Sequence, residues 1–251
     1  NSIPGGSRSS SNTARATVDP ASGLVTGIAA GTATITYHVG TGCFNILHIT
    51  VNPLPASITG NAPVCEGSQL ALSSATPGGI WFSSNTSIAT VNYISGLVTG
   101  VLGGTAGVTY SLPTGCLAQV TVTVNQTPPA ISGSGYICQG TTVAYSDAMA
   151  GGTWISSTPS VATIGSLSGI ASPVSLGTTI ITYRLTATGC MALKEATVSP
   201  LPVVYNVTGG GSYCAGDNGV HLGLDGSQAG VSYVLYYGSS ATGYLAGRGL
   251  V

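Results

Sequence analysis

The chain has 251 residues, of which 4% are charged, and its formal net charge is −1. A nucleic-acid-binding surface needs clustered lysine and arginine to neutralise phosphates, and five basic residues in the whole chain exclude that class of partner. Thr, Ser and Gly interrupt every apolar stretch before it reaches the roughly 18 residues of a membrane-spanning helix. No membrane insertion is therefore expected in this region.

Short runs of Val, Ile, Thr and Tyr alternate with Gly and Pro along the chain, a pattern that predicts an all-β fold. Within residues 32–51, apolar and polar residues alternate with a period of two on both sides of the turn at Gly40–Cys43. This predicts a hairpin with one buried face. His38 and His48 fall on its outward face, and we expect them to be solvated side chains that hold no metal.

One stretch of sequence recurs at a fixed spacing of about 73 residues, and such self-similarity means that each repeat is one structural unit. Two arginines, Arg8 and Arg15, interrupt the first copy where the second copy has Trp81 and Ile88. The three copies lie at Gly5–Val18, Gly78–Val91 and Gly151–Ile164, followed by Ser22–Gly27, Ser95–Gly100 and Ser168–Ile170.

Three proline-bearing linkers divide the chain, because proline fixes φ and removes a backbone donor from a strand ladder. They are Pro53–Pro55, Thr127–Pro129 and Pro200–Pro202. The expected parts are 1–52, the C-terminal half of a repeat; 56–125 and 130–199, two complete repeats; and 203–251, the N-terminal part of a divergent repeat. An opening strand is expected near Ala56–Thr59, and a strand of another subtype at Val231–Tyr237.

The six cysteines alternate between two sequence contexts, Gly-Cys and apolar-Cys-x-Gly. Regular recurrence in such a chain predicts disulfides and an oxidising compartment. Zinc is the rival interpretation, but it needs clustered Cys-x-x-Cys motifs or histidine partners, which the sequence lacks. The disulfide candidates are Cys43, Cys65, Cys116, Cys138, Cys190 and Cys214.

The chain offers little for catalysis, since its six carboxylates are scattered over different repeats and no paired acid and base is expected. We predict that it is no enzyme and has no catalytic residue, no cofactor and no metal. Asp217–Gly219 and Asp225–Gly226 are interpreted as turns and not as calcium ligands. Trp81 and Trp154 are expected in the core, with carbohydrate platforms as the alternative. Glycosylation sequons begin at Asn85, Asn125 and Asn206.

The motif series Gly-Gly-x-Trp-x-Ser-Ser-Asn, Ile-Ala-Thr-Val, Ser-Gly-Leu-Val-Thr-Gly and Val-Thr-Tyr resembles the bacterial immunoglobulin-like group 2 domain. It is most similar to the cysteine-bearing version found in tandem on very large Bacteroidota surface proteins. The resemblance covers roughly residues 3–199 well and 203–251 loosely, and departs from the pattern at Arg8 and Arg15. It implies tandem Ig-like β-sandwiches that form an extended rod, on a secreted or cell-surface protein exported by the type 9 route.

Two functions follow from this resemblance. The first is a structural repeat region of an extracellular fibre, filament or adhesin stalk. The alternative is a glycan- or ligand-binding accessory module of a secreted enzyme. The expected partners are neighbouring repeats and further copies of the chain, because sheet edges without lysine invite association. A host surface or a glycan is a further candidate partner.

The cysteine spacing fits three pairing schemes: within a repeat (Cys65–Cys116, Cys138–Cys190), across a linker (Cys43–Cys65, Cys116–Cys138, Cys190–Cys214), or between neighbouring repeats (Cys65–Cys190). In an Ig-like sandwich the first two schemes separate the cysteines by a strand length of roughly 25 Å. A disulfide needs Cα atoms within about 7 Å. The resemblance therefore favours the third scheme, which would clamp adjacent repeats.

Overall fold

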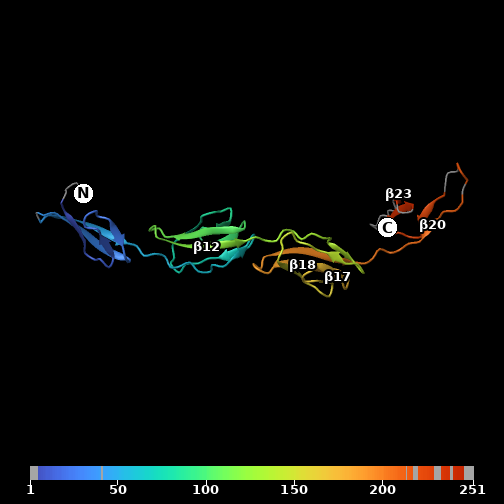
Figure 1. The fold of residues 1–251 in the computed structure, drawn as a ribbon, viewed down its shortest axis with the longest axis horizontal. Coiled ribbons are helices and arrows are strands. Elements are labelled where there is room, and N and C mark those ends of the chain that lie inside the picture. The colour runs from blue at the N-terminus through green and yellow to red at the C-terminus, as the bar shows by residue number, and fades with distance from the viewer. Residues whose placement is uncertain are drawn as a thin grey trace. The chain divides into compact units, whose positions relative to one another are not determined.

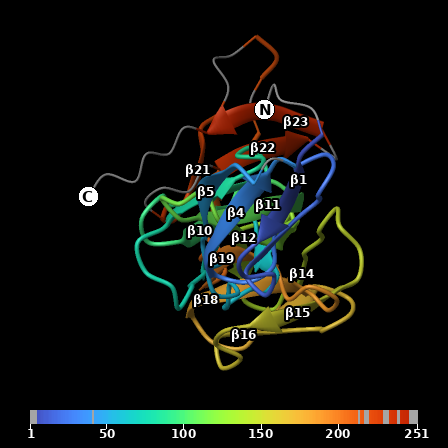
Figure 2. The same cartoon turned by 90° about the vertical axis from the view of Figure 1, so that its left-hand side faces the viewer.

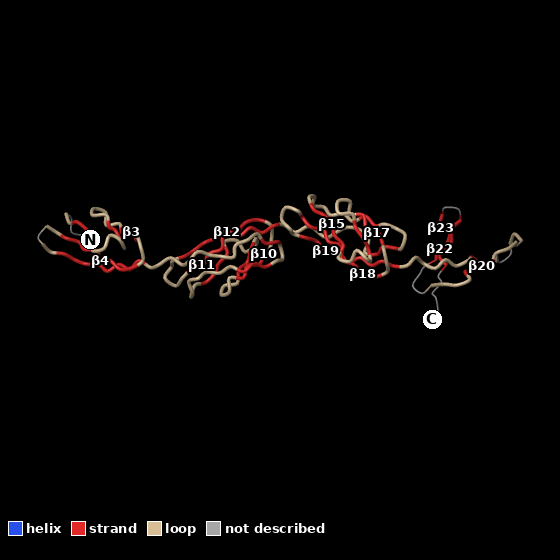
Figure 3. The backbone as a smooth tube through the Cα atoms, turned by 90° about the horizontal axis from the view of Figure 1, so that it is seen from below, coloured by secondary structure: helices blue, strands red, loops and turns tan. Residues whose placement is uncertain are grey.

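The computed structural model describes residues 5–40, 42–212, 214–216, 220–228, 233–237 and 240–245. Figure 3 shows this part of the chain as strands joined by loops, without a helix. The predicted all-β class is confirmed. Among these described residues there is consequently no apolar helix of membrane-spanning length.

The second repeat, residues 56–125, is a sandwich of two sheets (Figure 1). The larger sheet has the strand order β6-β12-β11-β8 and the smaller has the order β7-β10-β9. The strands are β6 (Val64–Cys65), β7 (Gln69–Ala71), β8 (Ile80–Ser83), β9 (Ala89–Val91), β10 (Leu97–Gly100), β11 (Gly104–Ser111) and β12 (Leu117–Asn125).

Its core lies between the two sheets and is built by the alternation of the β11–β12 hairpin. Val108 pairs with Val120 and Ala106 with Val122, so one parity of each strand points inward. Buried members of this core cluster are Val64, Leu72, Trp81, Ala89, Val98, Ala106, Val108, Tyr110, Val122 and Val124. Val64 and Leu72 come from the short β6–β7 segment, which therefore closes the core from one side.

Strand β6 pairs with β12 in the parallel direction, with Val64 opposite Val124 and Cys65 opposite Asn125. The short turn after β6 contains Gly67 at a φ of 76°, a conformation that favours glycine. The chain then crosses to the other sheet as β7. A single short segment thus adds one edge strand to each sheet.

The third repeat, residues 130–199, has the same plan. Its sheets have the orders β13-β19-β18-β15 and β14-β17-β16. The strands are β13 (Tyr136–Cys138), β14 (Val143–Ala144), β15 (Gly152–Ser156), β16 (Ala162–Ile164), β17 (Ile170–Pro173), β18 (Gly177–Leu185) and β19 (Met191–Ser199). Tandem Ig-like β-sandwich repeats of about 73 residues are thereby confirmed.

The first segment, residues 1–52, contains the equivalents of five of these strands. Strands β1 (Ser7–Ser10), β4 (Gly31–His38) and β5 (Phe44–Val51) form one sheet, and β2 (Ala16–Val18) pairs with β3 (Val25–Gly27). Figure 2 shows β1 beside β4. The predicted hairpin of residues 32–51 is confirmed as β4–β5, with Ile35 opposite Leu47.

The described residues of the last segment, from residue 203, form two strand pairs. Strand β20 (Val207–Gly209) pairs with β21 (Leu222–Leu224), and β22 (Tyr233–Tyr237) pairs with β23 (Ser240–Leu245). The predicted strand at Val231–Tyr237 is present from Tyr233 onward, and its first two residues lie outside the described part.

The predicted opening strand at Ala56–Thr59 is wrong, because only an isolated bridge from Thr59 to Ser73 forms there. Side-chain hydroxyl groups form hydrogen bonds with the backbone groups that a β-ladder would need. The N–H of Ala56 donates to Thr76 Oγ1 (2.8 Å), and its carbonyl accepts from Ser74 Oγ (3.1 Å).

By contacts the chain forms two compact units. The first contains Asn1–Pro129, Ala148–Gly152 and Arg184–Ala192, and the second contains Ala130–Asp147, Thr153–Tyr183 and Leu193–Val251. The tip of the β18–β19 hairpin thus belongs with the first unit. The fourfold division expected from the sequence stays a prediction.

Candidate functional site

Cys65 and Cys190 form a disulfide inside the first unit, with their Cα atoms 5.7 Å apart. Cys65 ends β6 of the second repeat, and Cys190 lies in the turn between β18 and β19 of the third. The Cys190 side chain is 1% exposed. This is the between-repeat pairing that the resemblance favours, and the bond clamps two repeats together.

The register explains why the within-repeat alternative does not form. Cys65 is level with Asn125 at the end of β12, whereas Cys116 lies just before the start of that strand. Nine residues of strand at ~3.3 Å each separate the two levels by roughly 30 Å. A disulfide bridges Cα atoms no more than about 7 Å apart.

Glu66, next to the disulfide, holds the turn and the following linker in place. Its Oε1 accepts from the N–H of Gly103 (2.6 Å), and its Oε2 accepts from the N–H of Thr127 (3.1 Å). Thr127 Oγ1 donates in return to the carbonyl of Glu66 (3.2 Å). In the sequence Glu66 is only one of six scattered carboxylates. The repeat pattern does not indicate its role, because the equivalent position in the third repeat is Gln139 and not a carboxylate.

The remaining cysteines lie apart from this bond. Cys43 is an exposed thiol, and Cys116 and Cys138 are half-buried thiols. Cys214 is exposed in the last segment. The Cys116 thiol lies 3.8 Å from the backbone carbonyl oxygen of Asn52. Disulfides at these four residues stay predictions.

Both tryptophans are in the core: Trp81 is 4% exposed and Trp154 is 6% exposed. Trp81 packs on Tyr110 with ring centroids 4.7 Å apart. The Tyr110 hydroxyl donates to the Thr76 carbonyl (2.6 Å) and accepts from the N–H of Gly79 (2.8 Å). A Cβ at Gly79 would lie 2.5 Å from the tyrosine ring, which explains the glycine two residues before Trp81.

Arg8 and Arg15 replace apolar residues without burying a charge. The Arg8 guanidinium lies over the ring of Tyr37, 5.0 Å from its centroid, and donates to the carbonyl of Ala21 (2.6 Å). Arg15 lays its aliphatic stem along Gly31 and donates to the carbonyl of Ala30 (2.6 Å). Arg8 thus substitutes a cation–π contact for the tilted ring contact of Trp81 and Tyr110.

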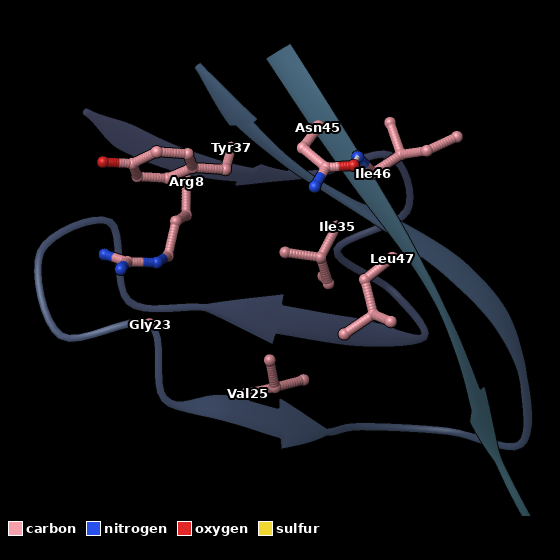
Figure 4. Close-up of a pocket in the computed structure, with 8 residues that line it drawn as sticks. All are labelled: Arg8, Gly23, Val25, Ile35, Tyr37, Asn45, Ile46 and Leu47. Atoms are coloured by element: carbon pink, nitrogen blue, oxygen red, sulfur yellow. Dashed lines mark hydrogen bonds between the residues drawn. The ribbon is translucent and has the colours of Figure 1, made fainter. Parts of the chain in front are cut away.

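A cavity of about 210 Å³ opens beside Arg8 in the first repeat (Figure 4). Figure 4 shows Val25, Ile35 and Leu47 directed toward the space between their strands. The lining residues are Arg8, Gly23, Val25, Ile35, Tyr37, Asn45, Ile46 and Leu47.

The two outward histidines do not face each other. His38 is opposite Phe44, with ring centroids 5.9 Å apart, and His48 Nδ1 lies 3.1 Å from Thr34 Oγ1. Within the described ranges, no three His, Cys, Asp or Glu side chains gather in a way that could hold a metal ion.

The acidic turn candidates have local roles. Asp225 accepts from the N–H of Asn206 (2.8 Å) and from its side-chain amide (2.7 Å). Asp217–Gly219 lie outside the described residues. Asp19 accepts from the N–H of Ser22 (2.6 Å); hydrogen bonds from the backbone and hydroxyl of Ser22 lower the pKa of the Asp19 carboxyl.

The asparagines of the three glycosylation sequons lie in different structural surroundings. The Asn85 side chain accepts from the N–H of Ser87 (3.1 Å). Asn125 is the last residue of β12 and lies opposite Cys65. The side-chain amide of Asn206 donates a hydrogen bond to the Asp225 carboxylate.

Residues 8–45 match the family described as bacterial Ig-like domain (group 2). Among solved structures, the chain is similar to the S-layer protein SbsC, domains 4 and 5, at 24% identity over 49% of this chain and 70% of that chain (TM-score 0.22). A C-terminal intimin fragment matches at 13% identity over 71% and 59% (TM-score 0.30). Drosophila N-cadherin EC1-3 matches at 13% identity over 81% and 91% (TM-score 0.26).

A comparison with curated proteins finds no match. The family match falls on the first repeat, and the other two repeats share its strand plan. The chain therefore resembles tandem bacterial immunoglobulin-like (group 2) repeats.

Proposed function

We propose that the chain is a structural repeat region of an extracellular fibre, filament or adhesin stalk on a bacterial surface. Residues 1–52, 56–125, 130–199 and 203–251 are successive Ig-like modules of this region. Its task is to give length and stiffness, and it catalyses no reaction.

The Cys65–Cys190 disulfide is the observation that carries the proposal. It joins two repeats that are separate in sequence, whereas a bond that only stabilised one small domain would lie within it. Disulfides persist in oxidising compartments, which supports a location outside the cytoplasm. The buried prolines Pro55 and Pro128 stiffen the connections between repeats.

Electron microscopy of the purified chain tests the proposal. We expect elongated particles whose length increases when further repeats are included, because repeats in series add their lengths. The matched control is Cys65→Ser with Cys190→Ser, which should bend more widely at one position. Compact globular particles would contradict the proposed role.

The alternative function, a glycan-binding accessory module, has less support. Trp81 and Trp154 are buried, so neither presents a flat ring face to a sugar. A cavity of about 360 Å³ beside Trp81 does carry the hydroxyls of Ser73, Ser74 and Ser95. Saturable binding on a glycan array, lost with Ser74→Val, would favour this alternative.

A further inference from the structure

The cavity of about 360 Å³ beside Trp81 lies entirely within the second repeat. Its walls combine apolar side chains, among them Pro77 and Ile94, with serine and threonine hydroxyls. All the lining residues fall between Leu72 and Tyr110, inside a repeat that has all seven of its strands, β6 to β12. The cavity is therefore a feature of a complete repeat.

The indole N–H of Trp81 is a hydrogen-bond donor without an acceptor at this cavity. The Trp81 side chain is 4% exposed, and no described residue accepts a hydrogen bond from its Nε1 atom. A Cβ at Gly96 would lie 3.0 Å from Nε1, so the glycine leaves this edge of the ring uncovered. Buried tryptophan N–H groups usually have a partner. The donor therefore points to an acceptor that comes from outside the repeat.

The third repeat has the same arrangement around its tryptophan. Trp154 is 6% exposed, and among the described residues its Nε1 atom also lacks an acceptor. A Cβ at Gly169 would lie 3.0 Å from that atom. The uncovered indole edge thus recurs in both complete repeats.

The hydroxyl groups of the cavity are available to donate as well. Thr76 Oγ1 accepts from the N–H of Ala56 (2.8 Å), and Ser95 Oγ accepts from the N–H of Leu97 (3.4 Å), so each keeps its proton for a ligand. Within the part of the chain that the structure describes, no charged, Asn or Gln side chain lines the cavity. The site therefore favours a neutral ligand that brings acceptor oxygens.

A proline-bearing peptide has this chemistry. Proline carries a carbonyl oxygen but no N–H, and proline-rich segments are extended, with backbone carbonyls that have no partner of their own. Grooves with aromatic walls bind such segments because their conformation is already formed. A sugar is less suited, because its hydroxyls also donate and the faces of the Trp81 ring are buried.

The chain itself contains such a segment between its third and last repeats. The stretch Pro200–Val204, Pro-Leu-Pro-Val-Val, has no charged residue and lies between the end of β19 at Ser199 and the start of β20 at Val207. Leu201 is 57% exposed and Val204 is 91% exposed. A stretch of this kind is available to another molecule, and copies of the chain repel one another weakly.

We propose that the cavity beside Trp81 binds the Pro200–Val204 stretch of a second copy of the chain, with Trp81 Nε1 donating to a backbone carbonyl of that stretch. The hydroxyls of Thr76 and Ser95 supply further donors, and Ile94 offers an apolar surface to the proline rings. This inference goes beyond the proposed function, because a stalk needs length and stiffness but no peptide site.

Nuclear magnetic resonance of the full ¹⁵N-labelled chain tests the site, with a capped synthetic peptide of residues 198–205 as the probe. The two tryptophans give two indole signals, and Trp154→Phe identifies that of Trp81. Saturating peptide should shift the Trp81 indole proton downfield and slow its exchange with water by about tenfold or more, because the proton becomes hydrogen-bonded. An indole signal with unchanged position and exchange would show that water alone is its partner and would overturn the proposal.

Two controls locate the effect. A peptide with Pro200→Ala and Pro202→Ala should bind about tenfold more weakly or worse, since it loses both rings and gains two N–H groups. In the chain, Ile94→Asp should abolish the shift, whereas Leu102→Asp should keep it. Both side chains are exposed, at 81% and 57%, but only Ile94 lines the cavity. A response that survives Ile94→Asp contradicts the proposal.

Sedimentation of the unlabelled chain tests the identity of the partner. The free peptide should suppress concentration-dependent association, and so should Pro200→Ser with Pro202→Ser. Association that neither change reduces would overturn a second copy as the partner. A neutral monosaccharide that shifts the Trp81 signal where the peptide does not would assign the cavity to sugars and also overturn the proposal.

The two proposals fail separately. Elongated particles in the microscope without peptide binding would remove only this inference, and globular particles with peptide binding would remove only the proposed function.

Discussion

At the scale of single residues, side chains that sequence reasoning treated as isolated hold the backbone of distant segments. Glu66 reaches across 37 residues to Gly103, and the Tyr110 hydroxyl reaches across 34 to Thr76. Arg8 keeps the tyrosine of its repeat covered in the absence of tryptophan. Such contacts depend on the crossing of loops, so no local pattern in the sequence indicates them.

We predict that Glu66→Ala destabilises the second repeat by about 1–3 kcal/mol, because two backbone N–H groups lose a charged acceptor. Glu66→Gln should lose less, since it keeps one acceptor oxygen. Urea unfolding followed by tryptophan fluorescence measures the change. Glu195→Gln, an exposed carboxylate, is the control and should leave the midpoint unchanged.

Tyr145 should make the stability of the third repeat depend on pH in the alkaline range. Its hydroxyl donates to the carbonyl of Ser134 (2.8 Å), and burial raises the pKa of the phenol above its ordinary value of 10.0. An acid with a raised pKa stabilises the fold fully below its unfolded value and loses that contribution as pH rises through the folded one. Stability should therefore fall above pH 10, and less steeply in Tyr145→Phe. An identical slope in that variant would contradict the expectation; Tyr136→Phe, at an exposed hydroxyl, is the control.

At the scale of elements, the hairpins could be predicted from sequence, whereas the edge strands could not. The alternation in residues 32–51 predicts β4–β5 because its partners are adjacent in sequence. The parallel pairing of β6 with β12 joins Val64 to Val124, and two residues of strand carry no periodicity to reveal it. The expected strand at Ala56–Thr59 does not form, because the backbone N–H and carbonyl of Ala56 are hydrogen-bonded to side-chain hydroxyl groups.

Removal of the disulfide clamp is an element-scale prediction. Cys65→Ser with Cys190→Ser should destabilise the clamped repeats by about 2–5 kcal/mol, because the unfolded chain loses a cross-link over 125 residues. The two tryptophans, one in each clamped repeat, report both unfolding transitions. Cys43→Ser, at an exposed free thiol, should have no effect. Equal midpoints for the double variant and the native chain would contradict the prediction.

At the scale of the whole molecule, the low content of charged residues determines how weakly copies of the chain repel one another. With 4% charged residues and a net charge of −1, copies of the chain repel one another weakly. We expect concentration-dependent association in sedimentation, unchanged between about 0.02 and 0.5 M salt, because screening acts only on charges. A monomer at high concentration, or association abolished by salt, would show that this expectation is wrong.

The disulfide also decides which residues carry mechanical load. Tension applied at the two ends of the chain crosses directly from Cys65 to Cys190, so the residues between them lie off the force path. Stretching should therefore withhold the chain between the two cysteines, a sequence separation of 125 residues and roughly 440 Å when extended. Single-molecule stretching before and after reduction measures that hidden length. A thiol reductant would therefore release this length and leave the chain longer at the same tension.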